Sequence, residues 1–285
     1  MKFYLKYILG NYVSSDAIHL DLGNLLHKAL EIKYRDRIEG VPTDFDELIN
    51  MIYAGIQEDT DKDKGKLILG LNALRGKYSN NSFTNIDPKS NLSYDQKLEG
   101  FFDYLVHDQL EEGWSPFVVE QHFDFVYEDR VRLNGFIDRI DINEDGELRV
   151  VDYKSSNKVF EHKDLTSPLQ MFIYTLACEE MYGKTPVSHI YDMVLLGEKQ
   201  LACTKGYYNR AKKKLNKILD SIDEDTITGT FKPKATPLCH WCDFSKTNPA
   251  APFYTEDLCE YYSLWKPDRK TFEVNKVFEA EKLEF

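Results

Sequence analysis

Acidic residues occupy two predicted β-strands within residues 135–156, GFIDRIDINEDGELRVVDYKSS, and a short NEDG turn joins these strands into a hairpin. Because side chains alternate along a strand, Asp138 shares a face with Ile140, and Asp152 shares a face with Val150. Both carboxylates are therefore expected to point where apolar side chains point. Pairing of the strands is expected to bring the two carboxylates close together.

Two carboxylates on an apolar face repel each other and lose hydration, and a bound divalent cation is the simplest compensation. Oxygen ligands suit Mg²⁺ or Mn²⁺, and these ions suit phosphoryl chemistry because they polarise a phosphate and activate water. Lys154, on the face of Asp152, would stabilise the charge that develops beside the attacking water. The alternative is structural, with ordinary salt bridges from Asp138 to Arg139 or Arg149. Asp152 would then pair with Lys154.

Two helical stretches offer further polar side chains at a spacing of four residues, which places them on one helix face. In GNLLHKALE, Gly23, His27 and Glu31 form one stripe, in which the glycine allows close approach and the histidine offers a nitrogen ligand. In QMFIY, Gln170 and Tyr174 share a face in the same way. Each of these residues alone would more often be structural, so the prediction depends on the set.

The periodicity of apolar residues places these motifs on helices and strands. Helices are expected over residues 17–36, 43–57, most of 62–112, 169–183 and 209–222, with a polar break at 79–91. Three antiparallel strands are expected between residues 116 and 153, with turns at 128–129 and 143–146, followed by a buried strand over 188–197. This order predicts a mixed α/β core.

Composition limits the class of protein. The 285 residues, of which 42% are hydrophobic, suffice for one large core with an appended subdomain. A formal net charge of −12 disfavours nonspecific coating of nucleic acid but allows local basic patches around an acidic, cation-binding site. No apolar stretch is long enough to span a membrane and no signal-peptide cleavage site is present, so we expect a cytoplasmic location, that of the host if the chain is viral. The five cysteines argue against a disulfide framework.

The motifs resemble those of the PD-(D/E)XK nuclease superfamily, and within it the RecB-like group that includes the nuclease domains of RecB and AddB and the CRISPR adaptation nuclease. The resemblance depends on GNLLHKALE, GFIDRID, VDYKS and QMFIY, which occur in the order typical of that group. It implies a restriction-endonuclease-like fold, with a mixed β-sheet flanked by helices and a helical insertion over about 40–114 in a core of residues 1–230. Residues 231–285 would form a small subdomain rich in cysteine and aromatic residues.

The resemblance also implies roles for the motif residues. Four groups would bind the metal, namely His27, Asp138, Asp152 and the backbone carbonyl of Tyr153. The candidate catalytic residues are Asp138, Asp152, Lys154, Gln170, Tyr174 and Glu31. Lys154 would assist the hydrolytic water, whereas Gln170 and Tyr174 would contact DNA or orient their neighbours. Glu31 or Glu120 would support the metal ligands from outside, and Asp141, on the opposite strand face from Asp138, would pair with an arginine.

Three cysteines, Cys239, Cys242 and Cys259, resemble the C-terminal three of the four cysteines that hold a [4Fe–4S] cluster in AddB-type members. The first of the four cysteines, which the resemblance places before residues 2–8, is missing, so either the start is trimmed or Cys178 or Cys203 substitutes for it. A zinc site at the CHWC sequence, or a tail that binds no metal and folds on its aromatic residues, are the alternatives.

Basic residues gather in the helix expected over 209–222, namely Arg210, Lys212, Lys213, Lys214 and Lys217. They would follow a DNA backbone without reading its sequence, or form a solvated helix face. The expected activity is Mg²⁺- or Mn²⁺-dependent hydrolysis of DNA phosphodiester bonds by an exonuclease of recombination, repair or phage replication, with a helicase or recombinase as partner. A noncatalytic DNA-binding scaffold on the same fold and an RNA nuclease are the alternatives.

Overall fold

The computed structural model describes residues 18–58, 66–86, 91–107, 110–156, 158–166, 168–203 and 206–229, together with Cys242 and Phe244. Residues 16–216 form one compact unit, and residues 1–15 with 217–285 form the other. The elements below belong to the first unit, apart from the C-terminal part of the last helix. Among the described residues, no helix is both long and apolar enough to cross a bilayer.

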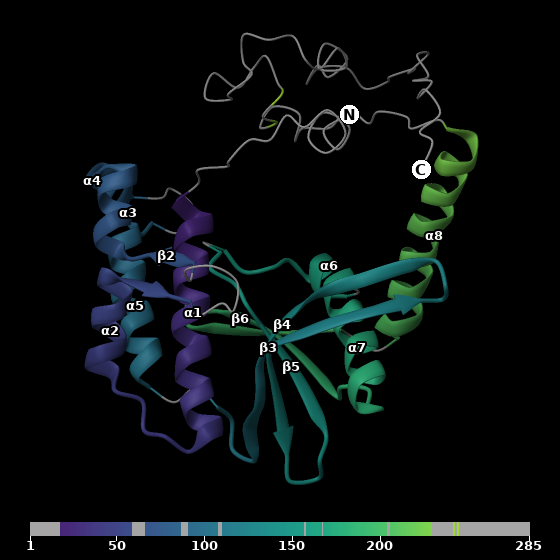
Figure 1. Ribbon diagram of the computed structural model, residues 1–285, viewed down its shortest axis with the longest axis horizontal. Coiled ribbons are helices and arrows are strands. Elements are labelled where there is room, and N and C mark those ends of the chain that lie inside the picture. Colours follow the sequence, from purple (N-terminus) through teal and green to yellow (C-terminus); the bar gives the residue numbers. More distant parts are fainter. Residues whose placement is uncertain are drawn as a thin grey trace. The chain divides into compact units, whose positions relative to one another are not determined.

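Five strands form one mixed sheet in the order β3-β4-β5-β6-β7 (Figure 1). Their bounds are β3 Trp114–Tyr127, β4 Val131–Asn143, β5 Leu148–Tyr153, β6 Ser188–Met193 and β7 Glu198–Ala202. The first three strands are antiparallel, β6 runs parallel to β5, and β7 returns antiparallel to β6. All six residues of β5 are buried, because the strand is central and both of its faces are covered. The predicted mixed sheet flanked by helices is confirmed.

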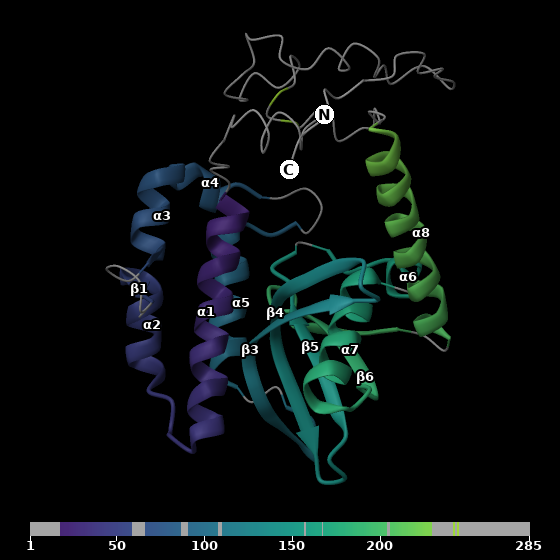
Figure 2. The same cartoon turned by 45° about the vertical axis from the view of Figure 1, so that its right-hand side comes forward.

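The first helix, α1 (Ile18–Glu39), packs against one face of the sheet, as both views show (Figures 1 and 2). A set of short elements packs with it: α2 (Phe45–Ala54), β1 (Gly55–Gln57), β2 (Leu67–Leu69), α3 (Leu71–Tyr78), α4 (Asn80–Thr84) and α5 (Tyr94–Val106). Leu30 and Tyr34 of α1 join the same hydrophobic cluster as Val151 and Tyr153 of β5. This first core therefore holds α1 in place beside the central strand.

The other face of the sheet packs against α7 (Leu169–Tyr182), with the short α6 (His162–Leu165) nearby in the chain. Met171 and Ala177 of α7 share a second hydrophobic cluster with Ile140 of β4 and Val150 of β5. Gly183 ends α7 in the left-handed conformation, with φ 63°, a position that favours glycine. The last helix, α8 (Tyr207–Thr228), begins against α7, where the rings of Tyr208 and Phe172 lie 5.0 Å apart.

The helix predicted over residues 43–57 is too long at its C-terminal end. α2 ends at Ala54, because Gly55 has φ 111°, which a helix does not allow, and residues 55–57 pair with β2 instead. A side chain at Gly70 would put its Cβ 2.3 Å from the backbone nitrogen of Gly55, so this turn needs glycine for close approach. The pattern also missed α6 and the mostly polar edge strand β7, and α4 falls inside the predicted polar break.

Candidate active site

The two aspartates of the hairpin meet where β4 and β5 diverge. The last regular pair toward the site is Arg139 with Val151. Beyond it, the Oδ2 atom of Asp138 accepts a hydrogen bond from the backbone N–H of Tyr153 at 2.6 Å, so this side chain takes the place of a strand partner. The side chain of Asp152 points into the second core and is 2% exposed, whereas that of Asp138 is 12% exposed and lies at the edge of the site.

Helix α1 brings a histidine to the same place. The Cβ atom of a residue at position 23 would lie 3.1 Å from the Oγ of Ser155, so Gly23 permits α1 to approach the chain just after β5, as predicted. One turn later, the Nδ1 atom of His27 lies 3.6 Å from the Oδ2 of Asp138. The imidazole also packs edge-on against the ring of Tyr153, with centroids 5.8 Å apart.

Glu120 of β3 completes a cluster of three potential metal ligands. Val119 pairs with Arg139 and Gln121 pairs with Ile137, so Glu120 lies opposite Asp138 across the strands. Its φ of 46° interrupts the regular strand and re-aims its side chain. One ligand atom each from His27, Glu120 and Asp138 lie within 4.8 Å of one another. From the sequence, Glu120 was expected only to support the metal ligands from outside. The signal that could have identified it as a ligand is its position as a lone acid in the largely apolar stretch PFVVEQHF.

The ionisation of this cluster shows an excess of buried negative charge. Burial raises the pKa of Glu120 to about 7, and the charges of Asp138 and Glu31 add to this effect. Burial likewise raises the pKa of Asp152 to about 6, helped by the Asp138 carboxylate and opposed by Lys154. Burial would lower the pKa of His27, but its hydrogen bond to Asp138 and the surrounding carboxylates outweigh burial and raise it. A cation would relieve the repulsion among these carboxylates.

Two residues of α7 orient Asp152 and Lys154. The side-chain amide of Gln170 donates to the Oδ1 of Asp152 at 2.8 Å, while its carbonyl oxygen accepts from the Nζ of Lys154 at 3.2 Å. The hydroxyl of Tyr174 donates to the same Oδ1 at 3.2 Å and accepts from Gln170 at 2.9 Å. Lys154 also forms an ion pair with the Oδ2 of Asp152. Gln170 and Tyr174 were expected either to contact DNA or to orient neighbouring residues, and these contacts favour the second role.

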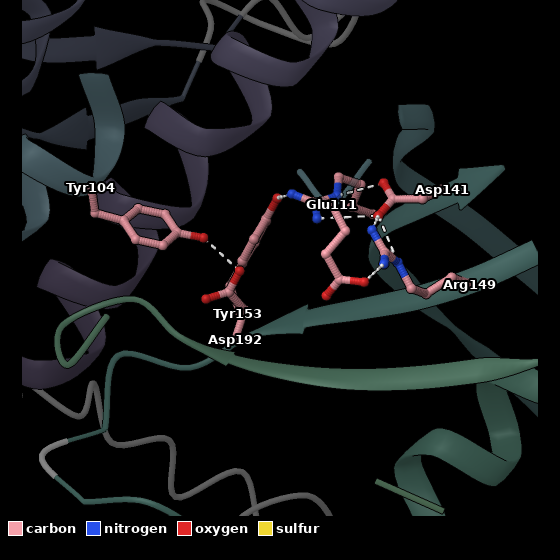
Figure 3. Close-up of polar contacts among 7 residues, drawn as sticks. Tyr104, Glu111, Asp141, Arg149, Tyr153 and Asp192 are labelled. Atoms are coloured by element: carbon pink, nitrogen blue, oxygen red, sulfur yellow. Dashed lines mark hydrogen bonds and ion pairs between the residues drawn. The ribbon is translucent and has the colours of Figure 1, made fainter. Parts of the chain in front are cut away.

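Asp141 belongs to a separate network on the other face of β4 (Figure 3). It accepts hydrogen bonds from the buried guanidinium groups of Arg139 and Arg149, which confirms the predicted pairing with an arginine. Arg139 further donates to the hydroxyl of Tyr153 at 2.7 Å, and Arg149 donates to Glu111 at 2.8 Å. Both arginines are thus engaged by Asp141 rather than by Asp138, so the salt-bridge alternative fails for Asp138. The ion pair between Asp152 and Lys154 does form.

The remaining candidates lie farther from the cluster or outside the described residues. Glu31 lies one turn after His27, and its carboxylate pairs with Lys28 and Arg35. Cys178 is fully buried within α7, where burial raises the pKa of its thiol to about 12, and this disfavours a thiolate ligand. The pKa of Cys203 is likewise raised to about 12 by burial.

Of the three C-terminal cysteines, Cys239 and Cys259 lie outside the described residues, and Cys242 is half-buried with a free thiol. The iron–sulfur cluster therefore stays a prediction. On α8, Arg210 donates to the carbonyl of Thr166 and Lys212 pairs with Glu128. The other predicted DNA-contacting residues are exposed, namely Lys213, Lys214 and Lys217.

Comparison with known proteins identifies the family. The family model described as PD-(D/E)XK nuclease superfamily matches residues 1–247. The chain belongs to the PD-(D/E)XK nuclease superfamily. The predicted resemblance is thereby confirmed, and the fold agrees with it.

Curated relatives share one description, since each is named as the same subunit of an ATP-dependent helicase/deoxyribonuclease. The relative from Streptococcus uberis is 40% identical over 201 residues, which cover 65% of this chain and 16% of that protein. The relative from Streptococcus agalactiae serotype Ia is 29% identical over 194 residues, with the same coverage of 65% and 16%. That from Clostridium perfringens strain SM101 is 28% identical over 159 residues, 53% of this chain and 14% of that protein. The matched region thus spans about one sixth of the length of these two streptococcal relatives.

The arrangement of the site suits a hard divalent cation. Carboxylate oxygens and one imidazole nitrogen form the donor set, and this chemistry favours Mg²⁺ or Mn²⁺ over softer metals. Burial, together with the nearby Asp138 carboxylate, raises the pKa values of Asp152 and Glu120, and a bound cation would oppose both effects. The residues therefore fit the cation that the superfamily implies. Lys154 is held by the side-chain oxygen of Gln170 and by its ion pair with Asp152.

Proposed function

We propose that this chain hydrolyses phosphodiester bonds of DNA in a reaction that depends on Mg²⁺ or Mn²⁺. The observation that carries the proposal is the arrangement where strands β4 and β5 diverge. There His27 lies beside Asp138, Asp138 accepts from the backbone of Tyr153, and the two neighbours of Tyr153, Asp152 and Lys154, form an ion pair. These residues come from α1, β4 and the C-terminal end of β5, so the meeting of the three elements is a property of the fold and not of local sequence. Relatives named as parts of a helicase/deoxyribonuclease support DNA as the substrate.

Each residue has a role in this proposal. His27, Asp138, Asp152, Glu120 and the backbone carbonyl of Tyr153 would hold the cation. The cation, when bound, would polarise the phosphate and lower the pKa of water. Lys154 would stabilise negative charge on the phosphate oxygens. Gln170 binds both the ammonium group of Lys154 and the carboxylate of Asp152, and so keeps the two side chains together. Tyr174 restricts the rotation of the Asp152 carboxylate through its hydrogen bond.

Contacts with the DNA backbone are proposed for the exposed lysines of α8. Lys213 and Lys214 are free to meet phosphates, whereas Lys212 is partly occupied by its ion pair with Glu128. Because the relatives are named as subunits of an ATP-dependent helicase/deoxyribonuclease, we propose a helicase as partner. Action at strand ends as an exonuclease of DNA recombination or repair would suit such a partner. Visible absorbance of the purified protein would test for an iron–sulfur cluster at Cys239, Cys242 and Cys259.

The test compares purified Asp152→Ala and Lys154→Ala variants with the wild type. End-labelled linear DNA and circular DNA, each single- and double-stranded, are incubated with Mg²⁺, Mn²⁺ or EDTA, and RNA is included as a separate substrate. We expect cleavage of DNA by the wild type with metal, and no cleavage by either variant. Asp145→Ala, in the exposed NEDG turn, is the matched control and keeps full activity.

Undiminished cleavage by Asp152→Ala or Lys154→Ala would overturn the assignment of the site. Cleavage of RNA but not DNA would replace the substrate. Folded wild type that binds DNA and cleaves neither polymer would favour the noncatalytic scaffold. Preference for linear over circular DNA separates an exonuclease from an endonuclease.

A further inference from the structure

The hairpin of β3 and β4 extends beyond the metal-ligand cluster and keeps one face open to solvent. On this face Glu120 lies opposite Asp138, and three cross-strand pairs follow outward from the cluster: His122 and Phe136, Asp124 and Asn134, and Val126 and Arg132. The opposite face of the same hairpin is packed, since Phe123 and Tyr127 are buried there. The hairpin is thus held by one face, and the pairs on the other face are available for contacts.

The pair of His122 and Phe136 is aromatic. The ring of Phe136 is 53% exposed, and its centroid lies 4.9 Å from that of His122, with 44° between the ring planes. The side chain of Asn134 contacts the Nε2 atom of His122 at 3.0 Å and fixes the imidazole ring. The neighbouring Gly135 is covered by Phe123 on the packed face, so Phe136 does not contribute to that core. An apolar ring is therefore oriented and left accessible.

The position of this pair relates it to the cluster. Phe136 precedes Asp138 by two residues on the same strand, so the two side chains share a face and are about 7 Å apart along it. His122 follows Glu120 by two residues on the neighbouring strand. The aromatic pair is therefore continuous with the group of ligands that would hold a phosphate-bound cation. A single exposed phenylalanine is common on protein surfaces, but one fixed by a histidine and adjacent to such a cluster is not explained by folding.

We propose that Phe136, supported by His122, stacks against an unpaired base of a single-stranded DNA whose phosphate lies at the cation cluster. This proposal rests on the proposed function and deepens it, because it names the substrate class as single-stranded or frayed DNA. A flat aromatic ring recognises the face of any base, whereas the bases within a duplex are already stacked and paired. The contact would hold the strand without a preference for sequence.

The test measures binding by the full chain carrying Lys154→Ala, in Mg²⁺, so that the predicted metal ligands are kept and the strand stays intact. Fluorescence anisotropy compares three labelled probes of equal length: oligothymidine, an oligonucleotide made of abasic residues, and a blunt duplex. Base stacking contributes about 1–3 kcal/mol per base, which is roughly a 5- to 150-fold change in affinity. We expect Phe136→Ala to weaken binding of oligothymidine by such a factor and to leave binding of the abasic strand and the duplex unchanged.

Two further variants control for structure. Phe136→Trp keeps an aromatic face and is expected to restore tight binding of oligothymidine. Phe117→Ala removes another exposed phenylalanine of β3, whose ring packs instead against Tyr182 at 5.4 Å, and is expected to bind all probes like the parent.

Three results would overturn the inference: equal affinity of Phe136→Ala and the parent for oligothymidine, equal losses on all three probes, or no binding of oligothymidine by the parent. Its failure is distinguishable from failure of the proposed function. If only the stacking inference fails, the wild type still cleaves DNA in the cleavage assay. If the proposed function fails, the wild type does not cleave DNA.

Discussion

Asp141 is a fully buried acidic residue outside the candidate active site, and its replacement by asparagine is a sharp perturbation. The carboxylate is fully buried and accepts four hydrogen bonds, two from Arg139 and two from Arg149, at 2.7 to 3.2 Å. Asparagine keeps the shape but offers one acceptor and one donor. Whichever way its amide turns, an N–H group must face the N–H groups of a guanidinium.

The magnitude follows from the competing electrostatic contributions. An ion pair at about 4 Å contributes about 4 kcal/mol at an effective dielectric constant of 20, so two such pairs contribute about 8 kcal/mol. Loss of the carboxylate charge also removes its own desolvation penalty of several kcal/mol. The two buried guanidinium groups keep their penalties, and Arg149 keeps only the half-exposed Glu111 as an acidic partner. We expect Asp141→Asn to lower the free energy of unfolding by about 3–5 kcal/mol.

Urea unfolding followed by circular dichroism measures this change, with the midpoint and the slope determined for each variant. Asp124→Asn is the matched control, because Asp124 also binds an arginine through two hydrogen bonds, both 2.6 Å long, but Arg132 is 72% exposed. Exposed pairs contribute little, so this control should unfold like the wild type. Equal midpoints for Asp141→Asn and Asp124→Asn would refute the reasoning, since burial would then have no effect.

Three further outcomes are expected. His189 is 2% exposed and burial lowers its pKa to about 4, so it contributes stability above its unfolded pKa of 6.5 that is lost as the pH falls from 6.5 through 4. Between pH 7 and pH 4, the free energy of unfolding in urea should therefore fall by about 3 kcal/mol more for the wild type than for His189→Gln. Equal decreases for the two proteins would contradict this. Gly135→Ala should lower the free energy of unfolding by about 1–3 kcal/mol, because its Cβ would lie 2.8 Å from the ring of Phe123, and Phe123→Leu in the same chain should recover part of the loss. Tyr104→Phe removes the hydroxyl that donates to the fully buried Asp192 and should cost about 1–3 kcal/mol, and an unchanged melting temperature would show that this hydrogen bond is dispensable.

Local patterns in the sequence sufficed for the groups that repeat at regular spacing. Gln170 and Tyr174 are four residues apart on a helix, and the structure brings both to one oxygen of Asp152. The pairing of Asp141 with arginine followed from strand alternation and is confirmed. These predictions succeeded because α-helices and β-strands fix the direction of a side chain from its position alone.

The elements that depend on irregular backbone could not be predicted from the sequence. Glu120 joins the cluster because its φ of 46° departs from the strand, and no pattern announces a left-handed residue that is not glycine, asparagine or aspartate. Likewise, β1 and β2 form where Gly55 and Gly70 pass close together, and this contact depends on residues 15 positions apart. Long-range contacts of this kind decide such elements, and a local window does not contain them.

The two hydrophobic clusters on either side of the sheet determine at which stage of folding the candidate site can bind a cation. His27 comes from the side of α1, whereas Gln170 and Tyr174, which orient Asp152, come from the side of α7, so neither packed layer alone both supplies the imidazole and orients this carboxylate. A cation that needs both would bind the complete fold in preference to any half-folded form, and would stabilise it in proportion to that preference. Under the proposed function, a chain that has assembled only one layer would bind the cation poorly and would not cut DNA.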